Sequence, residues 1–110
     1  MIHRKQGEYQ KAIENFSFEI KYKSQNEIKA YINRAFCFAK LGDHNNAISD
    51  YNSVLRLDNK NIHAYHNRAI SYEKLGKYNE AINDINEVIK LKPDDEHAKQ
   101  YLDECMKSIH

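Results

Sequence analysis

Glycine and proline are scarce in this chain, with three Gly and one Pro among 110 residues. A β-sandwich or β-barrel of this length needs a turn roughly every 8–12 residues, and therefore a richer supply of turn-forming residues. Collagen-like sequences and flexible linkers need far more glycine. The scarcity favours a helical chain, and the length suits a single domain.

Several other features are also missing. Two cysteines, Cys37 and Cys105, are too few for a disulfide scaffold. No apolar run approaches the roughly 18 residues of a membrane-spanning helix, and the first residues lack the apolar stretch of a signal peptide. The 17 basic residues balance 16 acidic ones, whereas nucleic-acid-binding domains carry clustered basic residues. We therefore expect a cytoplasmic protein that binds neither membranes nor nucleic acid.

The chain also lacks recognisable catalytic motifs. It contains no Gly-rich phosphate loop, no Gly-x-Ser-x-Gly turn and no His-Glu-x-x-His pair. We predict a non-enzymatic protein without a cofactor. A zinc site is one alternative, because His63 and His66 lie three residues apart and His97 occupies the position of His63 in the next unit. Polar residues that line a ligand groove explain the same pattern.

The three glycines show how the chain is organised. Gly7, Gly42 and Gly76 lie 35 and 34 residues apart. The sequence Ala-Tyr-Ile-Asn-Arg-Ala at residues 30–35 matches Ala-Tyr-His-Asn-Arg-Ala at residues 64–69, and each is followed by Lys-Leu-Gly. An Ala-Ile pair follows each glycine at the same distance. The chain is therefore built from an internal repeat.

Each repeat predicts a helix, a short turn at glycine and a second helix. Apolar residues recur every three or four positions on both sides of Gly42 and Gly76, which is the period of an amphipathic helix. Glycine suits the turn because it adopts a left-handed backbone without a Cβ clash. We expect Asp43, Asn61 and Asp94 to cap the helices that follow them.

The pattern Tyr-x2-Arg-Ala-x2-aromatic, then Gly, then Ala-x3-aromatic or Ile, resembles the tetratricopeptide repeat (TPR) family, as does the period of about 34 residues. The resemblance implies an all-α, right-handed solenoid of helix–turn–helix units. Residues 1–27 resemble a partial repeat with its turn at Gly7, residues 28–61 and 62–95 two full repeats, and residues 96–110 a capping helix. Since so few residues precede Gly7, we expect a fragment of a longer array.

Two arginines depart from the family pattern. Arg34 and Arg68 stand where the family usually has leucine, and an aspartate follows each of them sixteen residues later, at Asp50 and Asp84. In an antiparallel helix pair these positions face one another. We therefore predict two structural ion pairs, Arg34–Asp50 and Arg68–Asp84.

The resemblance also implies a concave groove lined by the first helix of each repeat. The family's groove positions fall on Lys29, Ile32, Asn33, Phe36, Lys40, His63, His66, Asn67, Ile70, Lys74, His97 and Tyr101. This mixture of basic, amide and apolar side chains suits an extended or helical peptide, and the lysines favour an acidic one. The implied function is a scaffold that holds a partner protein or peptide.

A sharper alternative comes from chaperone-binding members of the family, which grip an acidic C-terminal tail with a carboxylate clamp of Lys, Asn and Arg side chains. In one register, three of the five clamp positions match and the remaining basic pair is replaced. These positions are Lys29, Asn33 and Asn67, with His97 and Tyr101 in place of the basic pair. In the other register only Asn33 matches, and His63 and Asn67 replace the basic pair.

Two further alternatives remain open. The chain can be a structural segment of a longer solenoid, or a module attached to an enzyme elsewhere in a longer protein. The helix expected at residues 9–22 lacks a neighbour on one side and carries apolar residues that would be partly exposed. These residues are Ile13, Phe16, Phe18 and Ile20. Self-association through this N-terminal end is therefore another alternative.

Overall fold

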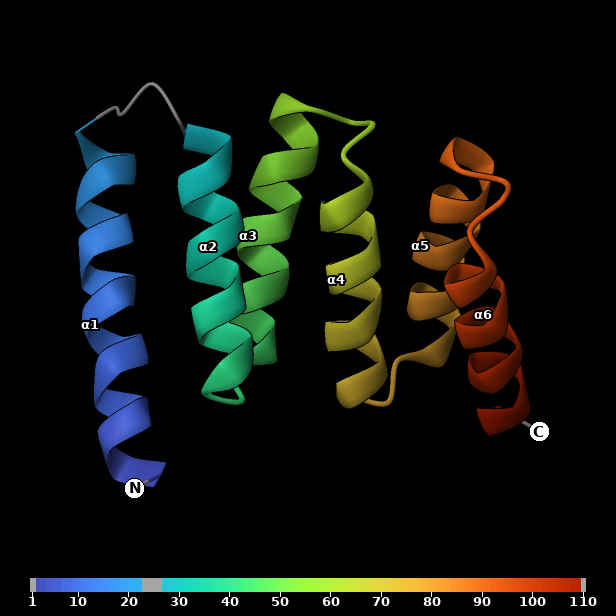
Figure 1. The fold of residues 1–110 in the computed structure, drawn as a ribbon, viewed down its shortest axis with the longest axis horizontal. Helices are drawn as coiled ribbons and strands as arrows, with labels where there is room; N and C mark the ends of the chain where they lie inside the picture. The colour runs from blue at the N-terminus through green and yellow to red at the C-terminus, as the bar shows by residue number, and fades with distance from the viewer. Residues whose placement is uncertain (1, 23–26, 110) are drawn as a thin grey trace.

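The computed structural model describes residues 2–22 and 27–109, and within them the chain forms six α-helices and no strand. The helices are α1 (Ile2–Lys21), α2 (Glu27–Lys40), α3 (His44–Leu57), α4 (Ile62–Lys74), α5 (Tyr78–Leu91) and α6 (Glu96–Ser108). They stand side by side, and the two ends of the chain lie at opposite ends of the row (Figure 1). The row measures 41 × 33 × 19 Å. The predicted all-α repeat solenoid is confirmed.

The turns at Gly42 and Gly76 are those expected from the repeat. Their φ angles are +81° and +77°, in the left-handed region that favours glycine. The N–H group after each glycine donates to a carbonyl of the helix that has just ended: Asp43 to Phe38, and Lys77 to Tyr72, both at 2.8 Å. These bonds satisfy carbonyl groups that the helix end would otherwise leave unpaired.

The expected turn at Gly7 is wrong. Helix α1 runs without a break from Ile2 to Lys21, and Gly7 does not adopt a positive φ angle. The five residues of α1 before Gly7 are too few to form a separate helix that buries an apolar face, since short helices are stable only when packed. As part of α1 they gain backbone hydrogen bonds. These outweigh the roughly 1 kcal/mol that glycine costs in a helix interior.

Two of the three predicted N-caps are confirmed. An Asp43 carboxylate oxygen accepts a hydrogen bond from the backbone N–H of Asn46 at 3.3 Å, at the start of α3. The Asn61 side-chain oxygen accepts one from Ala64 N–H at 3.0 Å, at the start of α4. Each bond satisfies one of the free N–H groups of a helix N-terminus.

The third cap is displaced by one residue. Asp95, not Asp94, caps α6, and its Oδ1 accepts a hydrogen bond from Ala98 N–H at 3.1 Å. Asp94 lies in the turn that follows α5, so the helix begins one residue later than the sequence suggested. The hydrogen bond from Ala98 lowers the pKa of the Asp95 carboxyl below its ordinary value of 3.8.

Small residues at the helix contacts let the repeats stack closely. The fully buried alanines are Ala35, Ala47, Ala64, Ala69 and Ala81. Each core cluster takes residues from the first helix of the next unit: Ala64 of α4 joins the first cluster, and Ala98 of α6 joins the second. Helix α4 thus contributes to both clusters, and each cluster joins helices of consecutive units, as in other stacked repeats. Cys37 and Cys105 are buried free thiols.

Both predicted ion pairs are confirmed. Arg34 Nε lies 2.8 Å from Asp50 Oδ2, and its Nη2 lies 2.6 Å from Oδ1. Arg68 and Asp84 repeat the same two distances one unit later. Both aspartates are buried, and hydrogen bonding to them raises the pKa of each arginine. The arginines therefore fasten α2 to α3 and α4 to α5 at equivalent points.

Helix α1 contacts α2 on one side and leaves large apolar groups in solvent. Ile13 is buried, whereas Phe18 and Tyr22 are 64% and 62% exposed. Phe16 and Ile20 are half-buried. The partial exposure expected for this helix is therefore present.

In the described part of the chain, no helix combines the length and the apolar character needed to cross a membrane.

Candidate functional site

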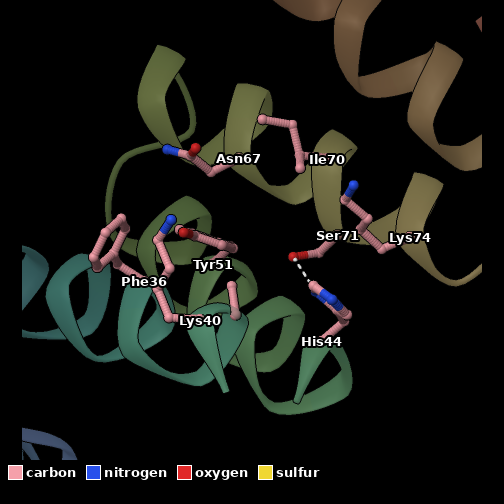
Figure 2. Close-up of a pocket in the computed structure, with 9 residues that line it drawn as sticks. Phe36, Lys40, His44, Tyr51, Asn67, Ile70, Ser71 and Lys74 are labelled. Carbon is pink, nitrogen blue, oxygen red and sulfur yellow. Dashed lines mark hydrogen bonds between the residues drawn. The ribbon is translucent and has the colours of Figure 1, made fainter. Parts of the chain in front are cut away.

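A cleft of about 240 Å³ opens between α2 and α4, and α3 supplies its floor (Figure 2). Helices α2 and α4 precede the turns at Gly42 and Gly76, and α3 follows the turn at Gly42. The lining residues are Phe36, Ala39 and Lys40 of α2, His44 and Tyr51 of α3, and Asn67, Ile70, Ser71 and Lys74 of α4.

Five of the twelve expected groove residues line this cleft: Phe36, Lys40, Asn67, Ile70 and Lys74. The other seven, which lie outside it, are Lys29, Ile32, Asn33, His63, His66, His97 and Tyr101. Phe36, Lys40, Ile70 and Lys74 come from the C-terminal halves of α2 and α4, and Asn67 lies near the middle of α4.

Sequence reasoning missed the floor of the cleft. Tyr51 and His44 come from the second helix of the repeat, whereas the groove was expected from first helices alone. Ser71 and Ala39 lie on α4 and α2, next to residues that were expected. Tyr51 belongs to the apolar residues that recur after Gly42, and it is buried, with 2% of its surface exposed. The sequence feature that could have pointed to His44 is its position directly after the turn at Gly42 and Asp43.

Two lysines give the rim of the cleft a positive charge. Lys40 comes from α2 and Lys74 from α4, and both are exposed. Among the described residues, neither lies within ion-pair distance of a carboxylate. The Lys40 ammonium lies 5.2 Å from the centre of the Phe36 ring, which is close enough for a cation–π contact. Both charges remain available to a ligand.

An aromatic surface lies beside these charges. Phe36 is 51% exposed, and its ring meets Tyr9 of α1 edge to face at a centroid distance of 6.4 Å. Tyr51 lies deeper in the cleft, and burial raises the pKa of its hydroxyl to about 12. Tyr51 therefore stays neutral at ordinary pH, and the floor adds no negative charge to oppose an acidic ligand.

Two polar contacts lie on the α4 side of the cleft. The Asn67 side-chain Nδ2 donates to the carbonyl of His63 at 2.9 Å, which orients the amide. The Ser71 hydroxyl oxygen lies 3.4 Å from His44 Nδ1, so α3 and α4 are joined at the floor (Figure 2). Asn67 keeps its side-chain oxygen, and one N–H, for a ligand.

Beyond α4, the expected groove residue Tyr101 has a local partner. Its hydroxyl donates to Glu73 Oε1 at 2.6 Å and fastens α6 to α4. Burial, with Glu73 close by, raises the pKa of Tyr101 well above its ordinary value. His66 packs edge to face against the same ring at 6.3 Å.

In the described part of the chain, no group of three or more His, Cys, Asp or Glu residues is arranged to hold a metal ion.

Two family profiles match parts of the chain. One described as tetratricopeptide repeat matches residues 63–95, and one described as TPR repeat matches residues 37–76. The chain is also 30% identical to the Arabidopsis OM64 TPR domain, with 94% of this chain and 85% of that chain covered and a TM-score of 0.83. The chain belongs to the tetratricopeptide repeat family. No curated protein matches it significantly.

Two other similar TPR structures hold peptides. The first TPR of Spaghetti (RPAP3), bound to the HSP90 peptide SRMEEVD, is 27% identical, with 97% of this chain and 84% of that chain covered and a TM-score of 0.86. The second TPR domain of human RPAP3, in complex with the HSP70 peptide SGPTIEEVD, is 28% identical, with 93% and 84% covered and a TM-score of 0.82. TPR domains are generally non-enzymatic, and these relatives support a protein-interaction module.

Proposed function

We propose that this TPR domain is a non-enzymatic scaffold that binds an extended acidic segment of a partner protein in the cleft between α2 and α4. The observation that carries the proposal is the pair of rim lysines, Lys40 and Lys74, one from each repeat and neither ion-paired among the described residues. Carboxylates of a ligand would meet both charges without displacing a bond within the domain.

The apolar part of the cleft suits a peptide rather than a small anion. Phe36 is half-exposed, Ile70 lines the opposite wall, and Tyr51 closes the floor. A concave apolar surface with a few polar groups is typical of binding sites, and aromatic anchors carry much of the energy at protein interfaces. An acidic segment with an apolar side chain beside its carboxylates would use both parts of the cleft.

The peptides held by the similar TPR structures have this composition. SRMEEVD and SGPTIEEVD both end in two glutamates, a valine and an aspartate. Their apolar valine lies between acidic residues. This pattern supports an acidic C-terminal segment as the occupant of the cleft in the present chain.

This chain has fewer of the basic side chains that form the family's carboxylate clamp. Tyr101, which stands at one basic position, is neutral and donates its hydrogen to Glu73. His97 stands at the other basic position and lies outside the cleft. Asn67 lines the cleft, whereas Asn33 lies outside it. We therefore propose the two rim lysines as the basic contacts.

Fluorescence anisotropy with labelled SRMEEVD and SGPTIEEVD tests this function. The wild-type domain should bind both peptides saturably, and a control peptide SRMQQVN with an amidated end should bind much more weakly. The double variant Lys40→Ala/Lys74→Ala should lose roughly tenfold or more in affinity, because two charge contacts disappear.

The matched control is Lys90→Ala/Lys107→Ala, which removes two exposed lysines from α5 and α6, outside the cleft. It should bind as the wild type does. Absence of binding at millimolar protein would contradict the proposed function. An equal loss in both double variants would show that net charge, and not the cleft, governs the affinity.

The exposed aromatic rings at the end of α1, with Tyr22 directly after the helix, favour self-association as a second function. The rings of Phe18 and Tyr22 lie 4.5 Å apart, and both are largely in solvent. We expect weak dimers at high concentration, measurable by sedimentation velocity. Phe18→Ser/Tyr22→Ser should abolish them, whereas Phe36→Ser in the cleft should not. A wild-type domain that stays monomeric at every concentration would contradict this second function.

A further inference from the structure

His44 is the histidine that lines the cleft. It is the first residue of α3, is half-buried, and lines the cleft floor between the two lysine-bearing helices. Its Nδ1 lies 3.4 Å from the hydroxyl oxygen of Ser71, whose side chain points toward it from α4 (Figure 2). Ser71 is only 1% exposed, so this contact is shielded from solvent.

The Ser71 hydroxyl keeps a bond to His44 in either protonation state. When the imidazole is neutral, the hydroxyl can donate to Nδ1, which leaves the N–H on Nε2. When the imidazole is charged, Nδ1–H donates to the serine oxygen, and Nε2–H remains free. Protonation therefore adds a positive charge to the cleft without breaking the contact that holds the ring.

The charged and titratable groups of the neighbouring elements are Lys40 on α2, Asp43 and Tyr51 on α3, and Glu73 and Lys74 on α4. Asp43 binds the backbone and side-chain N–H groups of Asn46, and Glu73 accepts from Tyr101. In the described part of the chain, no carboxylate forms an ion pair with His44. A ligand carboxylate beside His44 would favour the charged imidazole.

We propose that His44, held by Ser71, is a third contact for the acidic ligand, and that its protonation makes binding tighten as the pH falls. This inference rests on the proposed function. The sign follows from linkage: the bound state takes up a proton more readily than the free state, so lower pH favours the bound state.

The test is the affinity for labelled SRMEEVD between about pH 5.5 and 8, a range in which the peptide carboxylates stay ionised. We expect the wild-type affinity to rise roughly three- to tenfold toward the acidic end, as one added charge contact would give. His44→Gln keeps a side chain that can bond to Ser71 but does not titrate, and it should lose this rise. His63→Gln, an exposed histidine outside the cleft, should keep it.

A second measurement covers the case in which His44→Gln unfolds. NMR titration of the wild-type imidazole signals should show the His44 midpoint move to higher pH when the peptide is bound, while the His63 midpoint stays. Binding with no pH dependence, a rise that persists in His44→Gln, or an unmoved His44 midpoint would overturn this inference alone. Absence of binding at every pH would overturn the proposed function and this inference with it.

Discussion

Arg34 and Arg68 each connect their own helix to two others, which explains how an arginine stands where the family usually has leucine. Besides its aspartate, each donates from Nη1 to the second helix of the preceding unit: Arg34 to Ser17 at 2.9 Å and Arg68 to Asn52 at 2.7 Å. Two aromatic rings flank each guanidinium at 5.6–5.8 Å. The guanidinium thus keeps its hydrogen bonds while its faces pack against apolar rings.

Removing this arginine should therefore be costly. Arg68→Ala leaves Asp84 buried without its partner, and we expect the free energy of unfolding to fall by about 3 kcal/mol. Urea denaturation measures this value. The exposed pair Lys99–Glu96, at 3.5 Å, is the matched control, and Lys99→Ala should cost less than about 0.5 kcal/mol. Equal losses would show that Arg68 contributes no more than a surface charge.

The cap of α6 gives a pH-dependent prediction. Asp95→Ala removes the hydrogen bond to Ala98 and should lower the melting temperature, whereas Asp94→Ala in the neighbouring turn should change it little. The folded-state pKa of Asp95 is lowered, so its contribution is present above the ordinary value of 3.8 and is lost as the pH falls through the folded-state pKa. Thermal melts of the two variants should therefore converge in acid. The opposite order at neutral pH would restore Asp94 as the cap.

At the scale of the elements, the three glycines have two different structural roles, although their spacing in the sequence makes them look equivalent. Gly42 and Gly76 stop helices in a left-handed turn, whereas Gly7 lies within α1. The room for a side chain does not distinguish the three positions, because a Cβ added at any of them meets no neighbouring atom within 4 Å. The backbone angle is the difference.

Alanine substitutions test this distinction. Gly7→Ala should raise the free energy of unfolding by up to about 1 kcal/mol, because alanine is the better helix former. Gly42→Ala should lower it by roughly 1–2 kcal/mol, because an L-residue is strained at a positive φ angle. Chemical denaturation of both variants measures the two signs. If Gly7→Ala destabilises the domain as Gly42→Ala does, the chain turns at Gly7 after all.

At the scale of the whole molecule, the sequence predicted the features that recur at equivalent positions of the repeat. The period of the glycines placed the turns at Gly42 and Gly76, and equivalent spacing placed the Arg34–Asp50 and Arg68–Asp84 pairs. It did not predict the floor of the cleft. His44 and Ser71 meet only because α3 of one repeat packs against α4 of the next, and the distance between such side chains depends on how the helices stack.

The cleft also shows why net charge is a poor guide to this domain. The chain as a whole carries a formal charge of only +1. Three carboxylates that adjoin cleft residues in the sequence are bound within the fold: Asp50 by Arg34, Glu73 by Tyr101, and Asp43 by its helix. Lys40 and Lys74 therefore present a local positive surface, which is the property that an acidic partner would recognise.

NMR chemical-shift mapping with SRMEEVD tests the proposed site most directly. In ¹⁵N-labelled protein, the largest backbone amide shifts should fall on Phe36, Asn67, Ile70 and Ser71, around the cleft between α2 and α4. Amides on the outer surface of α5 should stay unchanged. Saturable shifts confined to the cleft are the predicted result. Shifts centred on α1 or α5, or none at millimolar peptide, would contradict it.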